Sequence, residues 1–214
     1  MGQVVIHRVF RREFGLSSDL VAAVRPGDLP RAALLAEHIG DVADALHHHH
    51  HSEDELLWPR LLARASVHTE LVERMEAQHQ SLSGALNEIG ALNEIDELLP
   101  RFRAEADAGV RDRLTVVLRD ASAGLDEHLA EEERAILPIA AEHLSTAEWN
   151  ELGERGSASI PKNKLLIFLG MILEDADPAE RTAFLAKMPL IARIMWRLLG
   201  RRQYDAYVTE LRAA

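Results

Sequence analysis

The sequence predicts an all-α protein: an up-down four-helix bundle followed by a C-terminal helical appendage. The 214 residues are rich in Ala, Leu, Glu and Arg, which are strong helix formers, and aromatic residues make up only 5%. No stretch alternates β-branched and polar residues as a half-buried strand would. Four long segments before residue 145 carry apolar residues at intervals of three and four, with short connections between them. Such a pattern is typical of a four-helix bundle.

The first predicted helix covers residues 3–24. One face carries His7, Phe10 and Phe14, whereas the charged side chains lie mostly on the opposite face: Arg8, Arg11, Arg12 and Glu13. Pro26, Gly27 and Pro30 then mark a turn, within which Asp28 is a suitable N-cap for the second helix. That helix should end or kink near Pro59, and one of its sides is expected to face inward: Leu35, His38 or Ile39, Val42, Leu46, His49 and Glu53.

The third and fourth helices are expected over about residues 69–95 and 108–142. The third contains a tandem GALNEI repeat (84–95), whose six-residue period does not fit a helix, so we expect a bend there, followed by a loop at Pro100. Its inward residues are Val72, Met75, His79, Leu82, Leu86 and Ile89. Those of the fourth are Leu114, Val117 or Leu118, Ala121, Leu125, His128, Glu132 and Ile136.

The character of the chain changes after residue 144. We therefore expect two domains: residues 1–144 as the bundle with a dinuclear metal site, and residues 145–214 as a helical extension packed on the bundle or on a second subunit of a homodimer. Ser145 or Thr146, Pro178 and Pro189 mark helix starts, and 153–161 looks like a connection. Trp196 lies near four arginines, and a solvated amphipathic face is preferred over an interaction surface there: Arg193, Arg197, Arg201 and Arg202.

The charge and the cysteine count exclude several classes of protein. The net charge is −11, and residues 145–214 hold ten Lys and Arg against nine Asp and Glu, so residues 1–144 carry −12. An acidic body argues against nucleic-acid binding. The N-terminus lacks the apolar core of a signal peptide, and no apolar run could span a bilayer, so we expect no membrane association. The absence of cysteine suits the cytoplasm and leaves His and carboxylates as the only metal ligands.

Two short blocks of the sequence align without a gap. Residues 49–59 read HHHSEDELLWP and residues 128–138 read HLAEEERAILP, so each is H-x3-E-x5-P. The spacing puts the imidazole and the carboxylate one helical turn apart on one face. This pairs His49 with Glu53 in the second helix and His128 with Glu132 in the fourth. Two such pairs are what two metal ions in a bundle core require.

The other two helices each offer one inward imidazole, His7 in the first and His79 in the third. A single His on an apolar face is more often a core residue, but the repeated pair makes a shared metal site the better interpretation. Two further registers of the histidine run keep the same spacing and remain as alternatives: His50–Asp54 and His51–Glu55. Only His49–Glu53 keeps the offset to the proline that the second block shows.

The number of ligands bears on reactivity. We consider two six-coordinate ions that share two bridging carboxylates and a bridging oxo or hydroxo group and that bind four imidazoles. Two coordination positions would then be left. His50, rotated by about 100° from His49 on the helix, could take one of them. The other would stay open to a small ligand.

These motifs resemble the hemerythrin-like, or HHE cation-binding, family of di-iron four-helix bundles over roughly residues 1–144. The resemblance implies two Fe ions with a bridging oxo or hydroxo group, bridged by Glu53 and Glu132, with the imidazole ligands His7, His49, His79 and His128. Imidazole and carboxylate alone would equally suit Zn or Mn. Oxygen-carrying hemerythrins have a second histidine where this chain has Met75, which departs from the carrier pattern. The C-terminal extension is similar to that of actinobacterial hemerythrin-like proteins.

The expected function is that of a cytoplasmic non-haem di-iron protein that binds or reacts with a small oxidant: O2, H2O2 or NO. Catalase-like peroxide decomposition and NO scavenging would both fit, so an oxidoreductase activity is a hypothesis. The alternative is an oxygen, redox or iron sensor without turnover. The sequence lacks a Gly-rich phosphate loop, a GxSxG motif and a cysteine nucleophile.

Overall fold

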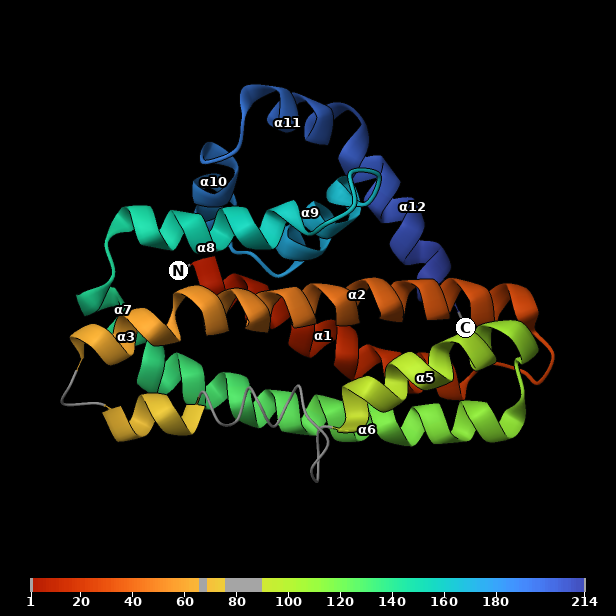
Figure 1. Ribbon diagram of the computed structural model, residues 1–214. Helices are drawn as coiled ribbons and strands as arrows, with labels where there is room; N and C mark the ends of the chain where they lie inside the picture. The colour runs from red at the N-terminus through yellow and green to blue at the C-terminus, as the bar shows by residue number, and fades with distance from the viewer. Residues whose placement is uncertain (1, 66–68, 76–89, 214) are drawn as a thin grey trace. The chain divides into compact units, whose positions relative to one another are not determined.

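The computed structural model describes residues 2–65, 69–75 and 90–213, and the regular structure of these residues is helical throughout, which confirms the all-α class (Figure 1). The chain forms two compact units, one of residues 13–159 and one of residues 1–12 with 160–214. Compact units are not folding domains, so the division at residue 144 stays a prediction. Within the described ranges, every helix is too short or too polar to cross a bilayer.

The first two helices follow the local signals in the sequence. Helix α1 covers Gly2–Ala22 and α2 covers Leu29–Leu56. The Asp28 side chain accepts a hydrogen bond from the backbone N–H of Arg31 at 3.1 Å, so it is the N-cap that the sequence predicts. Helix α3 (Trp58–Arg64) has Pro59 in its first turn. Proline lacks the N–H that would continue the α2 hydrogen bonds, and the predicted end near Pro59 is confirmed.

The third helix departs from its prediction. Residues 69–75 are helical, and Val72 and Met75 are fully buried as expected. Helix α5 covers Gly90–Glu105 and runs through Pro100, so the predicted loop at that residue is wrong. Buried apolar side chains lie on both sides of the proline, and burying them offsets the roughly 3 kcal/mol that an interior proline costs: Leu92, Ile95, Leu98, Leu99 and Phe102.

The fourth helix is continuous over the predicted span but contains one irregular turn. Helix α6 (Ala108–Glu131) passes into a π-helical turn, η2 (Glu132–Ile136), and then into α7 (Leu137–His143). Asp107 caps α6 by accepting hydrogen bonds from two backbone N–H groups. In the π turn the N–H of Leu137 donates to the carbonyl of Glu132, five residues earlier. The turn begins at the Glu of the second H-x3-E-x5-P block and ends before its Pro.

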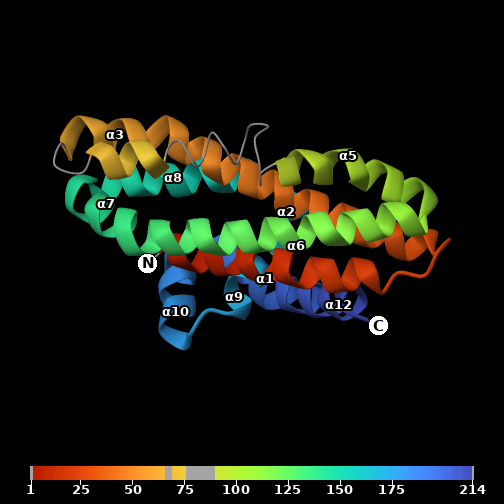
Figure 2. The same cartoon turned by 90° about the horizontal axis from the view of Figure 1, so that it is seen from below.

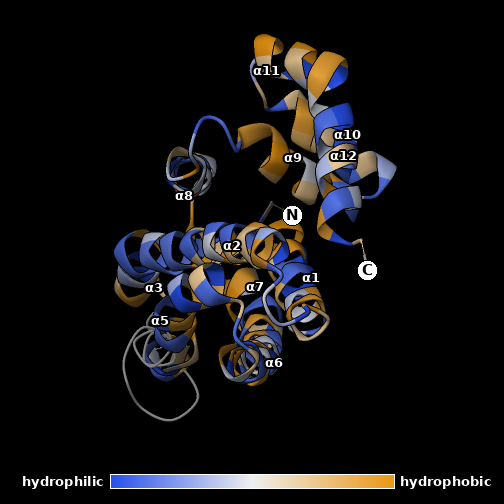
Figure 3. Ribbon diagram, turned by 90° about the vertical axis from the view of Figure 1, so that its right-hand side faces the viewer, coloured by the Kyte–Doolittle hydropathy of each residue, from blue (hydrophilic) through white to orange (hydrophobic). Residues whose placement is uncertain are grey.

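In the larger unit, α2, α5, α6 and the part of α1 from Glu13 onward run alongside one another around an apolar core (Figures 2 and 3). Helices α2 and α6 are long, and the shorter α5 packs against part of both of them. Its fully buried members include Phe14, Leu35, Ile39, Leu46, Ile95, Phe102, Leu114 and Leu118. The larger unit is thus a helical bundle of the predicted class, although α5 lies mostly beyond the predicted third helix (69–95).

A second apolar cluster occupies the end of the larger unit where α3, residues 69–75, α7 and α8 meet. Its buried side chains are Leu57, Trp58, Leu61, Ala65, Val72, Met75, Ile136, Ile139, Ala140, Leu144 and Leu152. Helix α8 (Thr146–Ala158) is capped by Ser145 in a capping box with Glu148. It contacts α2 and runs to Ala158, so residues 153–158 are helix and not part of the connection that the sequence predicts.

The smaller unit contains the remaining helices: α9 (Leu165–Glu174), α10 (Pro178–Ala186), α11 (Leu190–Met195), the π turn η3 (Trp196–Gly200) and α12 (Arg201–Leu211). Pro178 stands in the first turn of α10, as predicted, next to the N-cap Asp177. Helices α9 and α12 pack closely, because Gly170 has no side chain and the Tyr204 ring occupies that space. Tyr204 donates to Glu174, which also pairs with Arg212.

Candidate metal centre

The His–Glu pair of α2 lies on the inner side of that helix. His49 Nε2 is 3.3 Å from Glu53 Oε1, and their side chains are 10% and 1% exposed. The contact follows from the i, i+4 spacing, which brings the two side chains together on one helical face. The pair therefore presents an imidazole nitrogen and a carboxylate oxygen to the core.

Glu132, the first residue of the π turn, brings a second carboxylate to the same place. One ligand atom each from His49, Glu53 and Glu132 lies within 4.8 Å of the others. Glu53 and Glu132 are both fully buried. Burial raises the pKa of the Glu53 carboxyl well above its usual range, and the charge of Glu132 raises it further. Two carboxylates this close together in the protein interior are costly, and a bound cation would compensate their charge.

His7 is fully buried on α1. It belongs to the compact unit of residues 1–12 and 160–214, so its role as a ligand stays a prediction.

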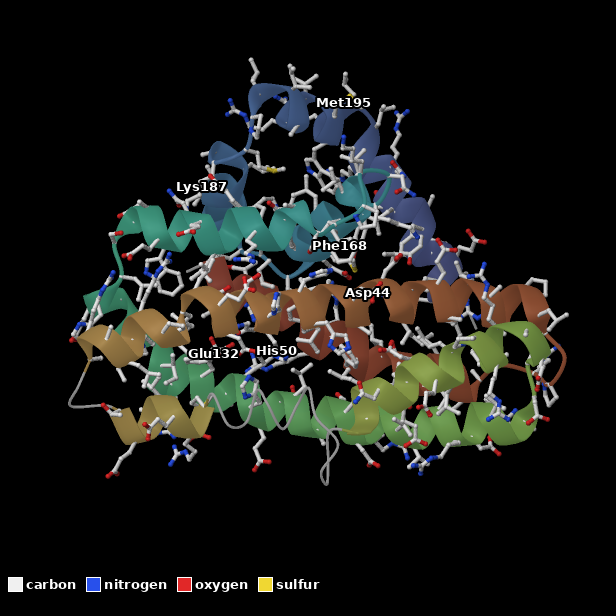
Figure 4. All side chains as sticks on the ribbon, viewed as in Figure 1. Asp44, His50, Glu132, Phe168, Lys187 and Met195 are labelled. Carbon is white, nitrogen blue, oxygen red and sulfur yellow. The ribbon has the colours of Figure 1, made fainter. Side chains whose placement is uncertain are left out.

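Two more imidazoles accompany the group on the facing helices. The rings of His50 and His128 meet edge to face with their centroids 5.3 Å apart, and the His49 and His50 centroids are 5.6 Å apart. His50 is 2% exposed and His128 is 5% exposed. Figure 4 shows His50 on α2 and Glu132 on η2, with both side chains directed into the space between these helices. His50 therefore lies beside the candidate ligands and not at the surface.

The other members of the histidine run lie elsewhere. His48 and His51 are exposed, and His47 is half-buried and lies 3.6 Å from Asp96 of α5. In the alternative registers, Asp54 accepts a hydrogen bond from Trp58 Nε1 at 3.0 Å, and Glu55 is exposed beside His51. The geometry thus favours the His49–Glu53 register.

His79 lies outside the described residues, so its role as a ligand stays a prediction. Met75, one turn before it, is fully buried in the second apolar cluster. The position of Met75 therefore belongs to an apolar wall in this chain.

Sequence reasoning missed a second buried polar pair in the bundle. His38 Nε2 lies 3.1 Å from Glu13 Oε2, and both side chains are 2% exposed. His38 lies on the side of α2 that is expected to face inward, whereas the sequence predicts Glu13 on the polar face of the first helix. Its place between Phe10 and Phe14 in the apolar stripe is the signal that could have revealed its burial.

The donor set suits a transition metal. The site combines carboxylate oxygens with imidazole nitrogens, and the chain has no cysteine, so soft thiolate chemistry is excluded. The residues present therefore fit a metal centre of carboxylate and imidazole ligands.

Comparison with known proteins agrees with this geometry. The family model of the hemerythrin HHE cation binding domain matches residues 4–140, which contain all of these side chains. No curated protein and no solved structure matches the chain. Since the match covers well over half of the 214 residues, the chain belongs to the hemerythrin HHE cation-binding domain family.

Proposed function

We propose that this protein is a non-haem di-iron protein that binds or reacts with a small oxidant: O2, H2O2 or NO. The proposed ligands are His7, His49, Glu53, His79, His128 and Glu132, with Glu53 and Glu132 bridging the ions and His50 as a further candidate. The observation that carries the proposal is the approach of two fully buried carboxylates within a group of imidazoles. A pair of metal ions would compensate their charge.

Iron supplies the redox chemistry when it is bound, and the protein groups hold and orient it. Imidazole and carboxylate also suit Mn and Zn. Membership in a cation-binding hemerythrin family makes iron the first choice. The metal content is therefore the first quantity to measure.

The surroundings of the carboxylates favour a small ligand. Leu57 follows Glu53 by one helical turn and Ile136 follows Glu132 by one turn, and both are fully buried in the second apolar cluster. An apolar wall thus closes one side of the site, and it excludes water and bulky polar substrates. A diatomic molecule or a peroxide can approach such a site without forming many polar contacts.

The test begins with metal analysis of protein that has been purified without added metal. We expect about two iron atoms per chain, near-UV oxo-to-iron absorption, and a change of that absorption on stopped-flow mixing with at least one of the three oxidants. Repeated turnover of peroxide would indicate a catalase-like enzyme, whereas a single reversible change would indicate a sensor. One zinc per chain without iron, or no optical response to any oxidant, would refute the proposal.

Matched variants test whether the bound iron lies at the proposed site. His49→Ala and Glu132→Gln should each lose most of the bound iron, because each removes a proposed ligand. His48→Ala and Glu127→Gln change the same residue types at exposed positions of the same helices and should keep it. Equal iron loss in the matched pairs would show that the metal binds elsewhere.

A further inference from the structure

The histidine run of α2 places two imidazoles on the side of the helix that faces away from the candidate metal centre. His47 and His51 are four residues apart, so their side chains lie one turn apart on the same side of α2. Two histidines at this spacing on one helix can bind a single zinc ion, as they do in the H-E-x-x-H motif. Their side chains are 33% and 60% exposed, so an ion can reach both of them.

A carboxylate from the neighbouring helix stands beside the first of these imidazoles. Helix α5 packs against α2 (Figure 1), and Oδ2 of its Asp96 lies 3.6 Å from Nε2 of His47. A hydrogen bond between these atoms would be shorter, at roughly 2.7–3.2 Å. Two ligand atoms on one tetrahedral zinc ion are about 3.4 Å apart, because each bond to the metal is about 2.0–2.1 Å long. The separation therefore suits two ligands of one ion better than a hydrogen bond.

The ring nitrogen of His47 lacks a hydrogen-bond partner. Its Nε2 atom is inaccessible to solvent, and no group in the described ranges forms a hydrogen bond with it. Buried polar atoms are rarely left in this state, and an exception points to a bound water molecule or ion. An imidazole nitrogen is the commonest metal ligand in proteins. A metal ion would therefore satisfy this atom.

The charges around His47 favour a cation. Asp44 lies one turn before His47 on α2. Partial burial raises the pKa of the Asp96 carboxyl, His47 lowers it, and the negative charge of Asp44 raises it. Asp44 is thus near enough to act on Asp96. Two carboxylates close to one imidazole leave an excess of negative charge that a divalent ion would compensate.

His51 can join these groups by a rotation of its side chain. Its Nε2 atom lies 3.1 Å from Oε1 of Glu55, and both side chains are exposed, so this contact contributes little to stability. Glu55 also pairs with Arg155 of α8, and this second partner would remain after the rotation. The rotation therefore replaces a weak exposed contact with a bond to a metal.

We propose that His47, His51 and Asp96 form a second metal site, which binds one divalent ion such as Zn²⁺ and links α5 to α2. Two imidazoles and one carboxylate form a ligand set that zinc accepts in open sites, where a water molecule takes the fourth position. The site shares no ligand with the proposed di-iron centre. It therefore does not depend on that proposal.

The first experiment is a calorimetric titration of Zn²⁺ into the protein as purified, followed by measurement of iron and zinc per chain. His47→Ala, His51→Ala and Asp96→Asn should each weaken the binding of one zinc per chain by more than about 10-fold, because even a residue that only orients a metal ligand contributes that much. The iron content of these variants should equal that of the wild type.

Two control variants match these substitutions. His48→Ala removes an exposed imidazole of the same run, which is rotated by about 100° from His47 on the helix. Glu97→Gln removes an exposed carboxylate next to Asp96 on α5. Both controls should bind zinc as the wild type does. Any zinc that enters the buried centre would do so equally in a variant and its control, so the difference between them reports the second site.

A second experiment tests the link between the helices by amide hydrogen exchange. Zinc should slow exchange in α5 around Asp96 as well as in α2, because one ion bound to both helices resists their local opening. Asp96→Asn should abolish the effect in α5, whereas Glu97→Gln should keep it.

Two results would overturn the proposal. Equal zinc binding by His47→Ala and His48→Ala would show that the pair of His47 and His51 does not hold the ion. Slower exchange that is confined to α2 would remove Asp96 from the site and with it the link to α5. Neither result bears on the proposed di-iron centre, whose own test is the iron content of His49→Ala and Glu132→Gln.

Discussion

Replacing Glu53 with Gln should make the stability of the metal-free protein much less dependent on pH. Glu53 is fully buried, and its burial and the charge of Glu132 raise its pKa well above the usual 4.5. Below pH 4.5 the group is protonated in both the folded and the unfolded chain. Above that pH the unfolded chain loses this proton while the folded chain keeps it. The free energy of unfolding should therefore fall as pH rises, until the pH passes the folded pKa.

The size of the effect follows from the proton count. One proton more on the folded chain lowers the free energy of unfolding by about 1.4 kcal/mol for each pH unit. A glutamine in place of Glu53 would keep the shape of the side chain and remove the ionisable group. The difference between wild type and Glu53→Gln should thus change by up to about 1.4 kcal/mol per unit above pH 4.5, with the variant more stable at neutral pH.

The assay is urea unfolding of chelator-treated protein at pH 5.5, 6.5 and 7.5, with Glu127→Gln as the control at an exposed position of α6. The control should follow the wild type at every pH. Adding iron should reverse the order, since the wild type then gains binding energy that Glu53→Gln loses. Parallel stability curves for wild type and Glu53→Gln without metal would refute the assignment of a buried, protonated carboxyl.

Three other substitutions test the fold through urea unfolding. Gly27→Ala should lower the free energy of unfolding by about 1–2 kcal/mol, because residue 27 has a φ of 81°, which strains an alanine. Nothing lies within 4 Å of the added methyl group, so the backbone strain is the whole effect. A change near zero would contradict it. Gly170→Ala drives a methyl group into the Tyr204 ring and should lower the free energy of unfolding by about 1–3 kcal/mol. The iron content per chain should not change. A variant as stable as the wild type would disprove the close packing of α9 on α12. Asp177→Ala removes the N-cap of α10 and should lower the free energy of unfolding by about 1 kcal/mol. Asp177→Asn should keep most of the stability that the cap provides.

Much of the helical framework could be predicted because its signals are local. The caps Asp28 and Ser145 and the prolines at 59 and 178 act on residues within one turn of themselves, so sequence alone reveals them. The same is true of the His49–Glu53 contact, which the i, i+4 spacing imposes inside one helix.

The other features are ones that the local sequence pattern does not reveal. Pro100 lies within α5 because buried side chains on both sides of it hold the helix together. The π turn at Glu132 alters hydrogen bonds without altering the apolar pattern, so periodicity does not reveal it. Helix α11 and η3 expose apolar side chains that have the spacing of a buried stripe, and spacing cannot say whether another element covers them.

The buried pair of Glu13 and His38 fixes how the second half of α1 aligns with α2. If one helix slid along the other by a single turn, about 5.4 Å, the carboxylate and the imidazole would part and each would face apolar neighbours. Separating a buried pair costs about 3–5 kcal/mol, although replacing both members with apolar residues is often harmless. The pair therefore contributes less to how stable the bundle is than to which of its many similar apolar alignments the chain adopts.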